Sequence, residues 1–437
     1  MNRKSTSLRR TWRRLAPLTA LLALAFGAAD AAAQWRIEPI AASEGVAQLQ
    51  DLAFDGQGRG VLSWQALLQG RVPPAFGGLA LRDPAGGWQR PPDLSRVDPA
   101  TTQLHLYGTD RALLIAREGG AAGPGKRRLA AADGTSDGGF AVPVTLGTFV
   151  AGSWSAANAA GDAIVAFRGE RSPFVSVAER RAGRRFGRAR DLAIARSATV
   201  AINARGDRLL AWPDGRKVAV RVRRAGAAWG RIVRFGRLEP DRDRRLSAVI
   251  APNGRIVITW GRDRGTCGVA VRSGSRWRVR RLERRCGSAA VGTRGAPVVP
   301  VVDSAGAIFV AWTHRTARAN SVTVARVGAA GPVGPVVVSR QRGALLDDIA
   351  AGPDRALAVT WAAVLSSTNP LLTATYAAVR RATGGFVIER VSPAGVTVGR
   401  GSRVAFQPLT SQAVVAIPYR IGRTVAVGSA VSPRPVP

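Results

Sequence analysis

The stretch DSAGAIFVAW, residues 303–312, contains the pattern that decides the fold. It begins at Asp303, reaches a glycine at Gly306 and continues as an apolar run that ends at Trp312. Aspartate favours turns and glycine adopts a positive φ without strain, so the first four residues predict a tight hairpin. The run after them has no polar alternation. We therefore expect a strand that is buried on both faces.

Eight copies of this pattern follow one another along the chain. Clear copies run from Asp55 to Trp64, Asn158 to Phe167, Asn203 to Trp212, Asn253 to Trp260 and Asp303 to Trp312, and weaker copies lie around Asp110, Asp354 and Ser411. Their anchor positions are 45 to 57 residues apart, the extremes being 161 to 206 and 355 to 412. A four-stranded antiparallel blade has a period of roughly 40–50 residues. The period therefore predicts an all-β chain that forms a β-propeller.

The two ends of the chain predict the number of blades and the way the ring closes. The fourth strand of a repeat opens with an aromatic residue, as from Trp277 to Leu282. The last repeat stops after residues 424–431 without such a strand, whereas Trp35 to Ile40 supplies one. We therefore predict eight blades, with the N-terminal strand joining the last blade and removing the exposed edges. The alternative is seven blades, in which the unit around residue 111 or 412 forms no full sheet.

The repeat resembles the β-propeller superfamily, and within it the Asp-box, sialidase-like propellers of secreted bacterial proteins. The resemblance covers residues 35 to about 432. Asp303, Gly306 and Trp312 match the Asp, Gly and Trp of the Asp box at a different spacing, and the pattern Ser-x-Asp-x-Gly-x-x-Trp does not occur intact. The resemblance implies a secreted propeller and leaves sialidase activity unsupported.

The first 33 residues have the features of a signal peptide. Several arginines precede an apolar segment from Leu15 to Phe26, which is too short to span a membrane. An A-x-A site follows, so cleavage is expected between Ala33 and Gln34. No later apolar run reaches transmembrane length. We therefore predict a secreted or cell-envelope-associated protein, exported by the Sec route rather than the twin-arginine route.

The mature chain is expected to be one propeller domain over residues 34–431, followed by a flexible tail over residues 432–437. No Ser/Gly-rich linker divides it, and we expect a monomer. Its two cysteines, Cys267 and Cys286, fall in one repeat, at the start of the third strand and after the fourth. Because an exported chain meets oxidising conditions, we predict a disulfide between them. Closing this loop contributes about 3 kcal/mol in the chain-entropy model.

The chain is strongly basic, with 64 basic and 28 acidic residues and a net charge of +36. Without residues 1–33 it keeps 58 basic and 27 acidic residues, a net charge of +31. In a propeller the loops after each second strand open on the same face as the loops between blades. The basic residues of the former loops, here called the loop rim, are Arg168, Arg171, Arg216, Lys217, Arg262, Arg264, His314, Arg315 and Arg318. Guanidinium groups bind phosphate and carboxylate, so we predict that the loop rim binds an anionic ligand.

Residues that carry catalytic or metal chemistry are scarce. The two histidines, His105 and His314, belong to no metal-binding motif, so we expect no metal site and no cofactor. His105 lies in an alternating strand and is expected to be structural, whereas His314 is expected in a loop where it can contact a ligand. The G-x-S-x-G match around Ser136 falls in a predicted β turn instead of a strand-to-helix elbow. We therefore expect no nucleophile there.

These observations favour a non-catalytic, exported scaffold at the cell envelope that uses its basic loop face for binding. Its expected partners are an anionic envelope polymer or a partner protein, with nucleic acid bound only non-specifically. The alternative is a sialidase-like, glycan-acting hydrolase, which needs two acids and arginines together at the mouth of the central channel. The acids expected in loops of that face are Glu170, Asp214, Glu239, Asp241, Asp263, Asp347 and Asp348.

Overall fold

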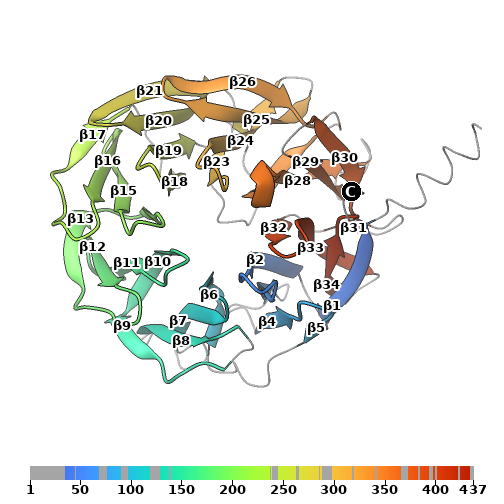
Figure 1. The fold of residues 1–437 in the computed structure, drawn as a ribbon, viewed down its shortest axis with the longest axis horizontal. Helices are drawn as coiled ribbons and strands as arrows, with labels where there is room; N and C mark the ends of the chain where they lie inside the picture. The colour runs from blue at the N-terminus through green and yellow to red at the C-terminus, as the bar shows by residue number, and fades with distance from the viewer. Residues whose placement is uncertain are drawn as a thin grey trace, which may run out of the picture.

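Figure 1 shows eight antiparallel sheets arranged as a ring, viewed along the axis of the ring. The structure, a computed structural model, describes residues 35–433 apart from short segments, the longest being 68–75, 90–96, 119–127, 239–244, 288–297 and 366–372. One short 3-10 helix, η1 (Pro353–Arg355), is the only helix in the described part of the chain. The prediction of an all-β, eight-bladed β-propeller is confirmed, and the seven-bladed alternative is excluded.

The first four blades follow one another in chain order. Blade 1 contains β2 (Val46–Phe54), β3 (Gly60–Leu67), β4 (Phe76–Arg82) and β5 (Trp88–Gln89). Blade 2 contains β6 (Val97–Tyr107), β7 (Arg111–Glu118), β8 (Arg128–Thr135) and β9 (Val144–Thr148). Blade 3 contains β10 (Val150–Ala157), β11 (Ala163–Gly169), β12 (Phe174–Arg180) and β13 (Arg190–Ile194). Blade 4 contains β14 (Thr199–Ile202), β15 (Arg208–Asp214), β16 (Lys217–Arg223) and β17 (Val233–Phe235).

The remaining blades keep this order, and in two of them a pair of short strands shares the innermost position. Blade 5 contains β18 (Arg245–Ile250), β19 (Ile256–Gly261), β20 (Cys267–Ser273) and β21 (Arg276–Glu283). Blade 6 contains β22 (Cys286–Gly287), β23 (Val298–Val302), β24 (Ile308–Arg315), β25 (Asn320–Gly328) and β26 (Gly331–Val337). Blade 7 contains β27 (Leu345–Ala351), β28 (Leu357–Val364), β29 (Thr373–Arg380) and β30 (Phe386–Arg390). Blade 8 contains β31 (Thr397–Val398), β32 (Arg403–Gln407), β33 (Gln412–Ile421), β34 (Thr424–Val431) and the N-terminal strand β1 (Arg36–Glu44).

The N-terminal strand closes the ring. β1 pairs antiparallel with β34 from Arg36 opposite Val431 to Glu44 opposite Thr424, and Figure 1 shows the two strands side by side. The preceding Trp35 is buried, and its indole Nε1 donates a hydrogen bond to Glu389 of blade 7 at 2.5 Å. The predicted closure is therefore confirmed. β34 is not left as an open edge strand, which would expose unpaired backbone groups.

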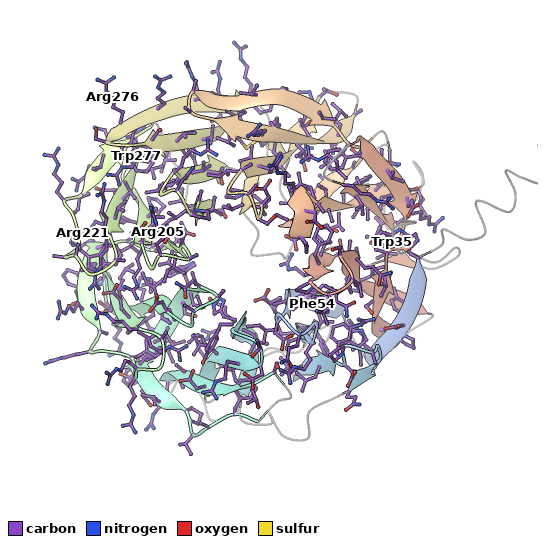
Figure 2. The ribbon with its side chains drawn as sticks, in the orientation of Figure 1. Trp35, Phe54, Arg205, Arg221, Arg276 and Trp277 are labelled. Atoms are coloured by element: carbon purple, nitrogen blue, oxygen red, sulfur yellow. A yellow bond between two sulfur atoms is a disulfide. The ribbon has the colours of Figure 1, made fainter. Side chains whose placement is uncertain are left out.

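Within each blade the strands run from the centre of the ring to its rim. Figure 2 shows Arg276, in the outermost strand β21, at the rim, and Arg205, in the turn after the innermost strand β14, closer to the centre. Antiparallel pairing places the turns between first and second strands on the same side as those between third and fourth strands. We call this side the turn face. The opposite side, here the loop face, carries the loops between second and third strands and the connections between blades.

The hydrophobic core is divided into eight clusters, one between each pair of neighbouring blades. The aromatic residue that ends the repeat pattern is buried in these clusters: Trp312 joins residues of blade 5, and Trp260 joins residues of blade 4. The ring of Trp260 lies against a glycine of the next strand. A Cβ atom placed on Gly268 would approach Trp260 Cε2 to 2.3 Å, so the glycine is required for this packing.

The repeat's polar residue organises the turn. In Asn203 the side-chain Oδ1 accepts hydrogen bonds from the backbone N of Arg205 and Asp207, and Gly206 has a φ of +83°. Its Nδ2 also reaches the next blade and donates to the backbone O of Ala251 at 3.2 Å. Asn158 makes the same bond to the backbone O of Asn203 at 3.0 Å. The turn residues therefore link blades 3, 4 and 5 as well as closing their hairpins.

The predicted disulfide between Cys267 and Cys286 is present, with a Cα–Cα distance of 6.0 Å. Its position differs from the expectation that both cysteines belong to one blade. Cys267 opens β20 in blade 5, whereas Cys286 lies in β22 and pairs opposite His314 of blade 6. The bond therefore joins two neighbouring blades covalently, because the chain crosses to the next sheet sooner than the repeat pattern indicates.

Several predictions fall at or beyond the limits of the described chain. The signal peptide and its cleavage site at Ala33 and Gln34 lie outside the described residues. At the other end, Ser432 is buried and its backbone N donates to the backbone O of Ala413 at 2.8 Å, while residues 434–437 lie outside the described part. Among the described residues there is no helix with the length and apolar character to cross a membrane.

Candidate anion-binding site

The described residues of the loop rim lie in blades 3, 4 and 6 and do not come together in one place. Arg171, Arg216 and Lys217 are exposed in tight connections on the loop face. Arg168 is half-buried, and its NH1 donates to the backbone O of Gly169 and Ser172, so it holds its own loop. Arg262, Arg264 and Arg318 lie outside the described residues. The rim as a ligand site therefore stays a prediction.

His314 is not in a loop, contrary to expectation. It lies in β24, and its Nδ1 is 2.5 Å from Glu283 Oε2 of the neighbouring blade. Arg315 ends the same strand and is half-buried. The loop after β24 begins later than the repeat pattern indicates, because β24 extends past Trp312 to pair with the short strand β22. His314 therefore contacts Glu283 of blade 5 from within a strand and does not lie in a surface loop.

The turn face contains a cleft with a high concentration of positive charge, between blades 3 and 4. The cleft has a volume of about 420 Å³ and is lined by seven arginines and one acid, Glu179. Its arginines are Arg180, Arg181, Arg188, Arg190, Arg208, Arg221 and Arg223. Val177, Leu192 and Trp229 supply apolar lining. We call it the 3/4 cleft.

Strand alternation explains why these side chains meet. Successive side chains of a strand point to opposite faces, so residues two apart share a face. Val177 and Glu179 share one face of β12, and Arg221 and Arg223 share one face of β16. Both strands are the third of their blade and run towards the turn face, where their polar ends come together across the boundary between the blades.

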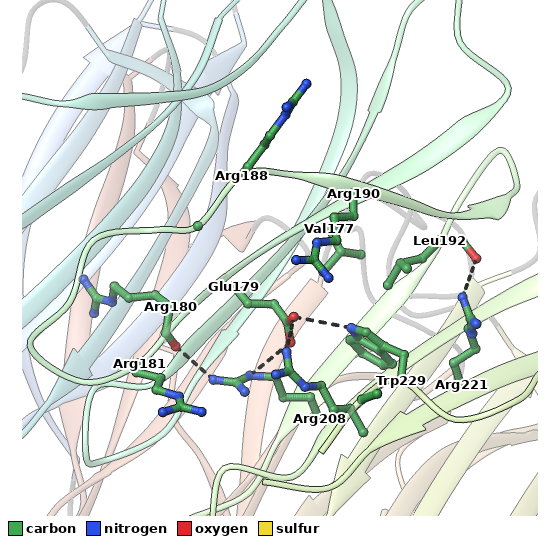
Figure 3. Close-up of a pocket in the computed structure, with 13 residues that line it drawn as sticks. Val177, Glu179, Arg180, Arg181, Arg188, Arg190, Leu192, Arg208, Arg221 and Trp229 are labelled. Atoms are coloured by element: carbon green, nitrogen blue, oxygen red, sulfur yellow. Dashed lines mark hydrogen bonds and ion pairs between the residues drawn. The ribbon is translucent and has the colours of Figure 1, made fainter. Parts of the chain in front are cut away.

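Glu179 is the acceptor at the centre of the 3/4 cleft, as Figure 3 shows. Its carboxylate pairs with NH1 of Arg223, lies 3.5 Å from Nε of Arg208, and accepts a bond from Trp229 Nε1 at 3.3 Å. Arg208 is 4 % exposed, and its NH2 also donates to the backbone O of Arg180 at 2.9 Å. Burial lowers the pKa of Arg208 and Glu179 partly offsets this effect, so the guanidinium stays protonated.

Three arginines of the cleft remain available. The side chains of Arg181, Arg188 and Arg190 are exposed and have no hydrogen bond or ion pair within the described part of the chain. Figure 3 shows Arg190 beside Val177 and Arg188 extending away from the Glu179 cluster. Glu179 compensates part of the charge of the buried arginines, which leaves the cleft with a positive excess. Such a site suits phosphate, sulfate or carboxylate groups.

Other arginines serve to pack one blade on the next. The guanidinium of Arg180 lies 5.3 Å from the ring centre of Tyr107 and 5.4 Å from that of Phe186, and it pairs with Asp133 of blade 2. A guanidinium over an aromatic face is attracted by the ring quadrupole. Part of the basic excess is therefore structural, a use that sequence reasoning did not predict.

A group of acids lies at the seam where the ring closes. Asp51 of blade 1 and Asp348 of blade 7 both interact with Arg403 of blade 8, and the adjacent Asp347 is buried. Burial raises the pKa of Asp51 to about 6, against the lowering effect of Arg403. Asp347 and Asp348 were expected in a loop, but both lie in β27.

Asp347 and Asp348 accept hydrogen bonds that join blade 7 to blade 8. Asp347 accepts bonds from the backbone N of Gly401 and from both the backbone N and Oγ of Ser402. Asp348 accepts one from the backbone N of Val404 at 3.2 Å. Because these oxygens stabilise the start of β32, the acids fit a structural role better than that of a catalytic pair. Among the described residues no group of three or more His, Cys, Asp or Glu could hold a metal ion.

His105 is part of a buried polar contact between blades 2 and 3. Its Nε2 is 2.6 Å from Ser155 Oγ, and this hydroxyl donates to Gln103 Oε1 at 2.5 Å. Burial and, to a lesser degree, the nearby positive charge of Arg180 lower the pKa of His105 to about 4. The histidine is therefore neutral near pH 7, and its contacts agree with the structural role expected from the sequence.

Comparisons with known proteins assign this chain to no family. No protein-family model and no curated protein matches it. Similar solved structures include an ulvan lyase of polysaccharide lyase family PL25 bound to -[GlcA(1-4)Rha3S]-, with 14% identity, coverage of 75% of this chain and 93% of that chain, and a TM-score of 0.45. YCF48 bound to D1 peptide has 11% identity, coverage of 90% and 94%, and a TM-score of 0.41. Hydrazine synthase from Kuenenia stuttgartiensis has 12% identity, coverage of 61% and 75%, and a TM-score of 0.42.

These likenesses are too distant to carry an argument about function. The Asp-box, sialidase-like resemblance gains no support from them. The function must therefore be argued from the geometry and charge of this chain.

Proposed function

We propose that the protein is a non-catalytic binding scaffold for a linear anionic polymer, and that the 3/4 cleft is its main contact. The observation that carries this proposal is the convergence of seven arginines and one glutamate on one cleft. The side chains of Arg181, Arg188 and Arg190 are exposed, so they can bind an anion without first breaking a contact within the described structure. The net charge of +31 that remains without residues 1–33 adds long-range attraction for any polyanion.

An exported location fits this function. Disulfides form and persist in oxidising compartments, and the Cys267–Cys286 bond joins two blades of this protein. An anionic polymer of the cell envelope is the ligand that such a location offers. A partner protein with an acidic surface is the other candidate.

The test uses two triple variants that remove equal charge from opposite faces. Arg181→Ser/Arg188→Ser/Arg190→Ser alters the 3/4 cleft, and Arg171→Ser/Arg216→Ser/Lys217→Ser alters the loop rim. Affinities for heparin, long-chain polyphosphate and double-stranded DNA are measured at several salt concentrations. We expect the cleft variant to lose at least tenfold in affinity for one polymer, with a flatter salt dependence, because fewer counterions are released. We expect the rim variant to lose much less.

The outcomes separate the alternatives. Equal losses in both variants would show that binding follows net charge, and would contradict a specific cleft. A larger loss in the rim variant would assign the site to the loop face, as the sequence predicts. Binding that is weak and similar for all three polymers, and that moderate salt abolishes, would show that the arginines serve only to keep the protein soluble.

A further inference from the structure

A second cleft lies on the turn face, between blades 6 and 7. Its volume is about 550 Å³, and its charged lining consists of Arg255, Arg326, Arg355, Arg380 and Asp303. The side chains of Arg326 and Arg355 are exposed and make no hydrogen bond or ion pair within the described ranges. We call it the 6/7 cleft. It is three blade boundaries away from the 3/4 cleft around the ring in Figure 1.

The strand registers show that the two clefts are built from equivalent positions of the repeat. Glu179 pairs opposite Ile164, three residues after Gly161, and Arg326 pairs opposite Phe309, three residues after Gly306. Arg326 therefore occupies the repeat position that Glu179 occupies in the 3/4 cleft. In the same way, Arg380 corresponds to Arg223: each pairs opposite the residue that begins the second strand of its blade.

This replacement leaves the 6/7 cleft without the carboxylate that pairs with an arginine in the 3/4 cleft. Arg380 lies 4.8 Å from the ring centre of Phe309 and 5.6 Å from that of Phe386, and its Nε has no hydrogen-bond acceptor in the described structure. Burial lowers the pKa of Arg380 and the charge of Asp303 offsets this effect in part. Asp303 Oδ1 is already bonded to the backbone N of Ala305 and Ala307, so it holds its own turn.

We infer that the 6/7 cleft is a second anion subsite, and that one polyanion chain occupies both clefts across the turn face. Arg380 is held between the two phenyl rings with an unused Nε–H, and Arg326 and Arg355 supply the outer charge. An anionic group seated there replaces the missing carboxylate at the position of Glu179. The ligand is a polymer with repeated phosphate, sulfate or carboxylate groups, because two subsites separated on one rigid face favour a chain that reaches both. This inference rests on the proposed function of the 3/4 cleft.

The experiment compares a short and a long probe of the same chemistry. Tripolyphosphate is too short to bridge the clefts, and long-chain polyphosphate can occupy both. The 6/7 variant is Arg326→Ser/Arg355→Ser, and the 3/4 variant is Arg188→Ser/Arg190→Ser. The control, Arg276→Ser/Arg278→Ser, removes equal charge from exposed positions of the outer strand β21. Calorimetric titration of the full chain gives stoichiometry and affinity for each probe.

We expect two tripolyphosphate molecules per wild-type chain and one in either cleft variant. For long-chain polyphosphate we expect each cleft variant to lose about 10²-fold or more in affinity, since the advantage of two linked contacts disappears. The control should differ from wild type by less than either variant. Arg326→Glu, which restores the carboxylate found at Glu179, should remove the second tripolyphosphate site by pairing with Arg380.

Three results would overturn the inference. If the 6/7 variant binds long-chain polyphosphate like the control while the 3/4 variant loses affinity, the second subsite is wrong and the proposed function stands. If both cleft variants behave like the control, the inference and the proposed function fail together. A single tripolyphosphate site in the wild-type chain also contradicts the inference.

Discussion

At the scale of single residues, one side chain of the repeat performs two tasks. Asn203 closes its own turn through Oδ1 and bonds the next blade through Nδ2. Aspartate can replace asparagine in the first task but not in the second, because a carboxylate has no donor. At Asn158 and Asn203 the amide is therefore needed for the bond to the next blade.

The Asn203→Asp substitution should lower the free energy of unfolding by about 1–3 kcal/mol, because it places a carboxylate against the carbonyl of Ala251. It also removes the bond from Nδ2 to Asp207 Oδ2 at 2.9 Å. Urea unfolding measures the change. The matched control is Asn253→Asp, since Asn253 is exposed and its oxygen bonds only to the backbone N of Arg255 in the described structure. Equal effects of the two substitutions would contradict the role of the Asn203 donor.

The seam acids predict a pH dependence of stability. Burial raises the pKa values of Asp51 and Asp347 to about 6 from 3.8, so the folded state holds these protons more tightly than the unfolded state. Their contribution is fully present below pH 3.8 and is lost as pH rises through about 6. His105 acts in the opposite direction: its pKa is lowered to about 4, so its contribution is lost as pH falls from 6.5 through about 4.

Asp51→Asn should reduce the difference in unfolding free energy between pH 4 and pH 7 by about 2–3 kcal/mol, because one of the titrating groups is gone. Urea titrations at both pH values provide the measurement, with Asp354→Asn at an exposed turn as the control. An unchanged difference in the Asp51 variant would show that its carboxyl titrates alike in both states.

At the scale of elements, blades 1 and 5 pack an aromatic ring of the second strand against a glycine of the third. Trp64 lies over Gly78 and Trp260 lies over Gly268, with the tryptophan in the second strand and the glycine in the third. The glycine allows the ring to lie flat within the sheet and to reach the cluster shared with the preceding blade. In these two blades the indole therefore occupies the space that a side chain on the third strand would fill.

Gly268→Ala should destabilise the protein by about 1–3 kcal/mol, because its Cβ would lie 2.3 Å from the Trp260 ring and the buried indole would have to move. A fall in unfolding midpoint, together with a changed tryptophan fluorescence of the native state, would report this shift. Gly385→Ala is the control, since a Cβ there meets nothing within 4 Å. A stable Gly268 variant with native fluorescence would show that this boundary is loosely packed.

At the scale of the whole molecule, the ring depends on pairing between the two ends of the described chain. β1 supplies the outer strand of blade 8, and Trp35 also bonds blade 7 through Glu389. The disulfide joins blades 5 and 6, far from this seam, so no covalent bond between described residues secures the closure.

A variant without residues 35–44 should expose the edge of β34 and self-associate, because an unpaired edge strand templates pairing with another chain. Sedimentation velocity against the full chain measures the association. Addition of a peptide of residues 35–44 should reverse it, since the peptide replaces β1. A deleted chain that keeps the sedimentation and the unfolding midpoint of the full chain would show that β34 needs no partner.

The sequence predicted the architecture well because the fold repeats. The turn residues, the buried second strand and the aromatic-led fourth strand recur at similar spacings along the chain. Eight copies therefore reveal the pattern even where a single copy is weak. The candidate site was harder to predict. Glu179 and Arg223 come from different blades, and only the strand registers show that they share a cleft. The sequence signal that could have found the 3/4 cleft is the pair of arginines two apart at the end of β16, Arg221 and Arg223.

Loop boundaries were the other source of error. His314 was expected in a loop but lies in β24, and Asp347 was expected in a loop but is buried in β27. In both cases the end of a strand is held by a neighbouring blade: His314 contacts Glu283 of blade 5, and Asp347 accepts bonds from Gly401 and Ser402 beside β32 of blade 8. Local patterns do not contain such contacts between sheets, so the ends of strands could not be read from one repeat alone.

The closing strand has a consequence for the order in which the protein is made. A ribosome produces β1 before any other described strand, and its partner β34 emerges last. During synthesis, therefore, β1 has no pairing partner until the strands of the other seven blades have been made. The ring can therefore close only after synthesis of the last strand, when the oldest and youngest segments meet.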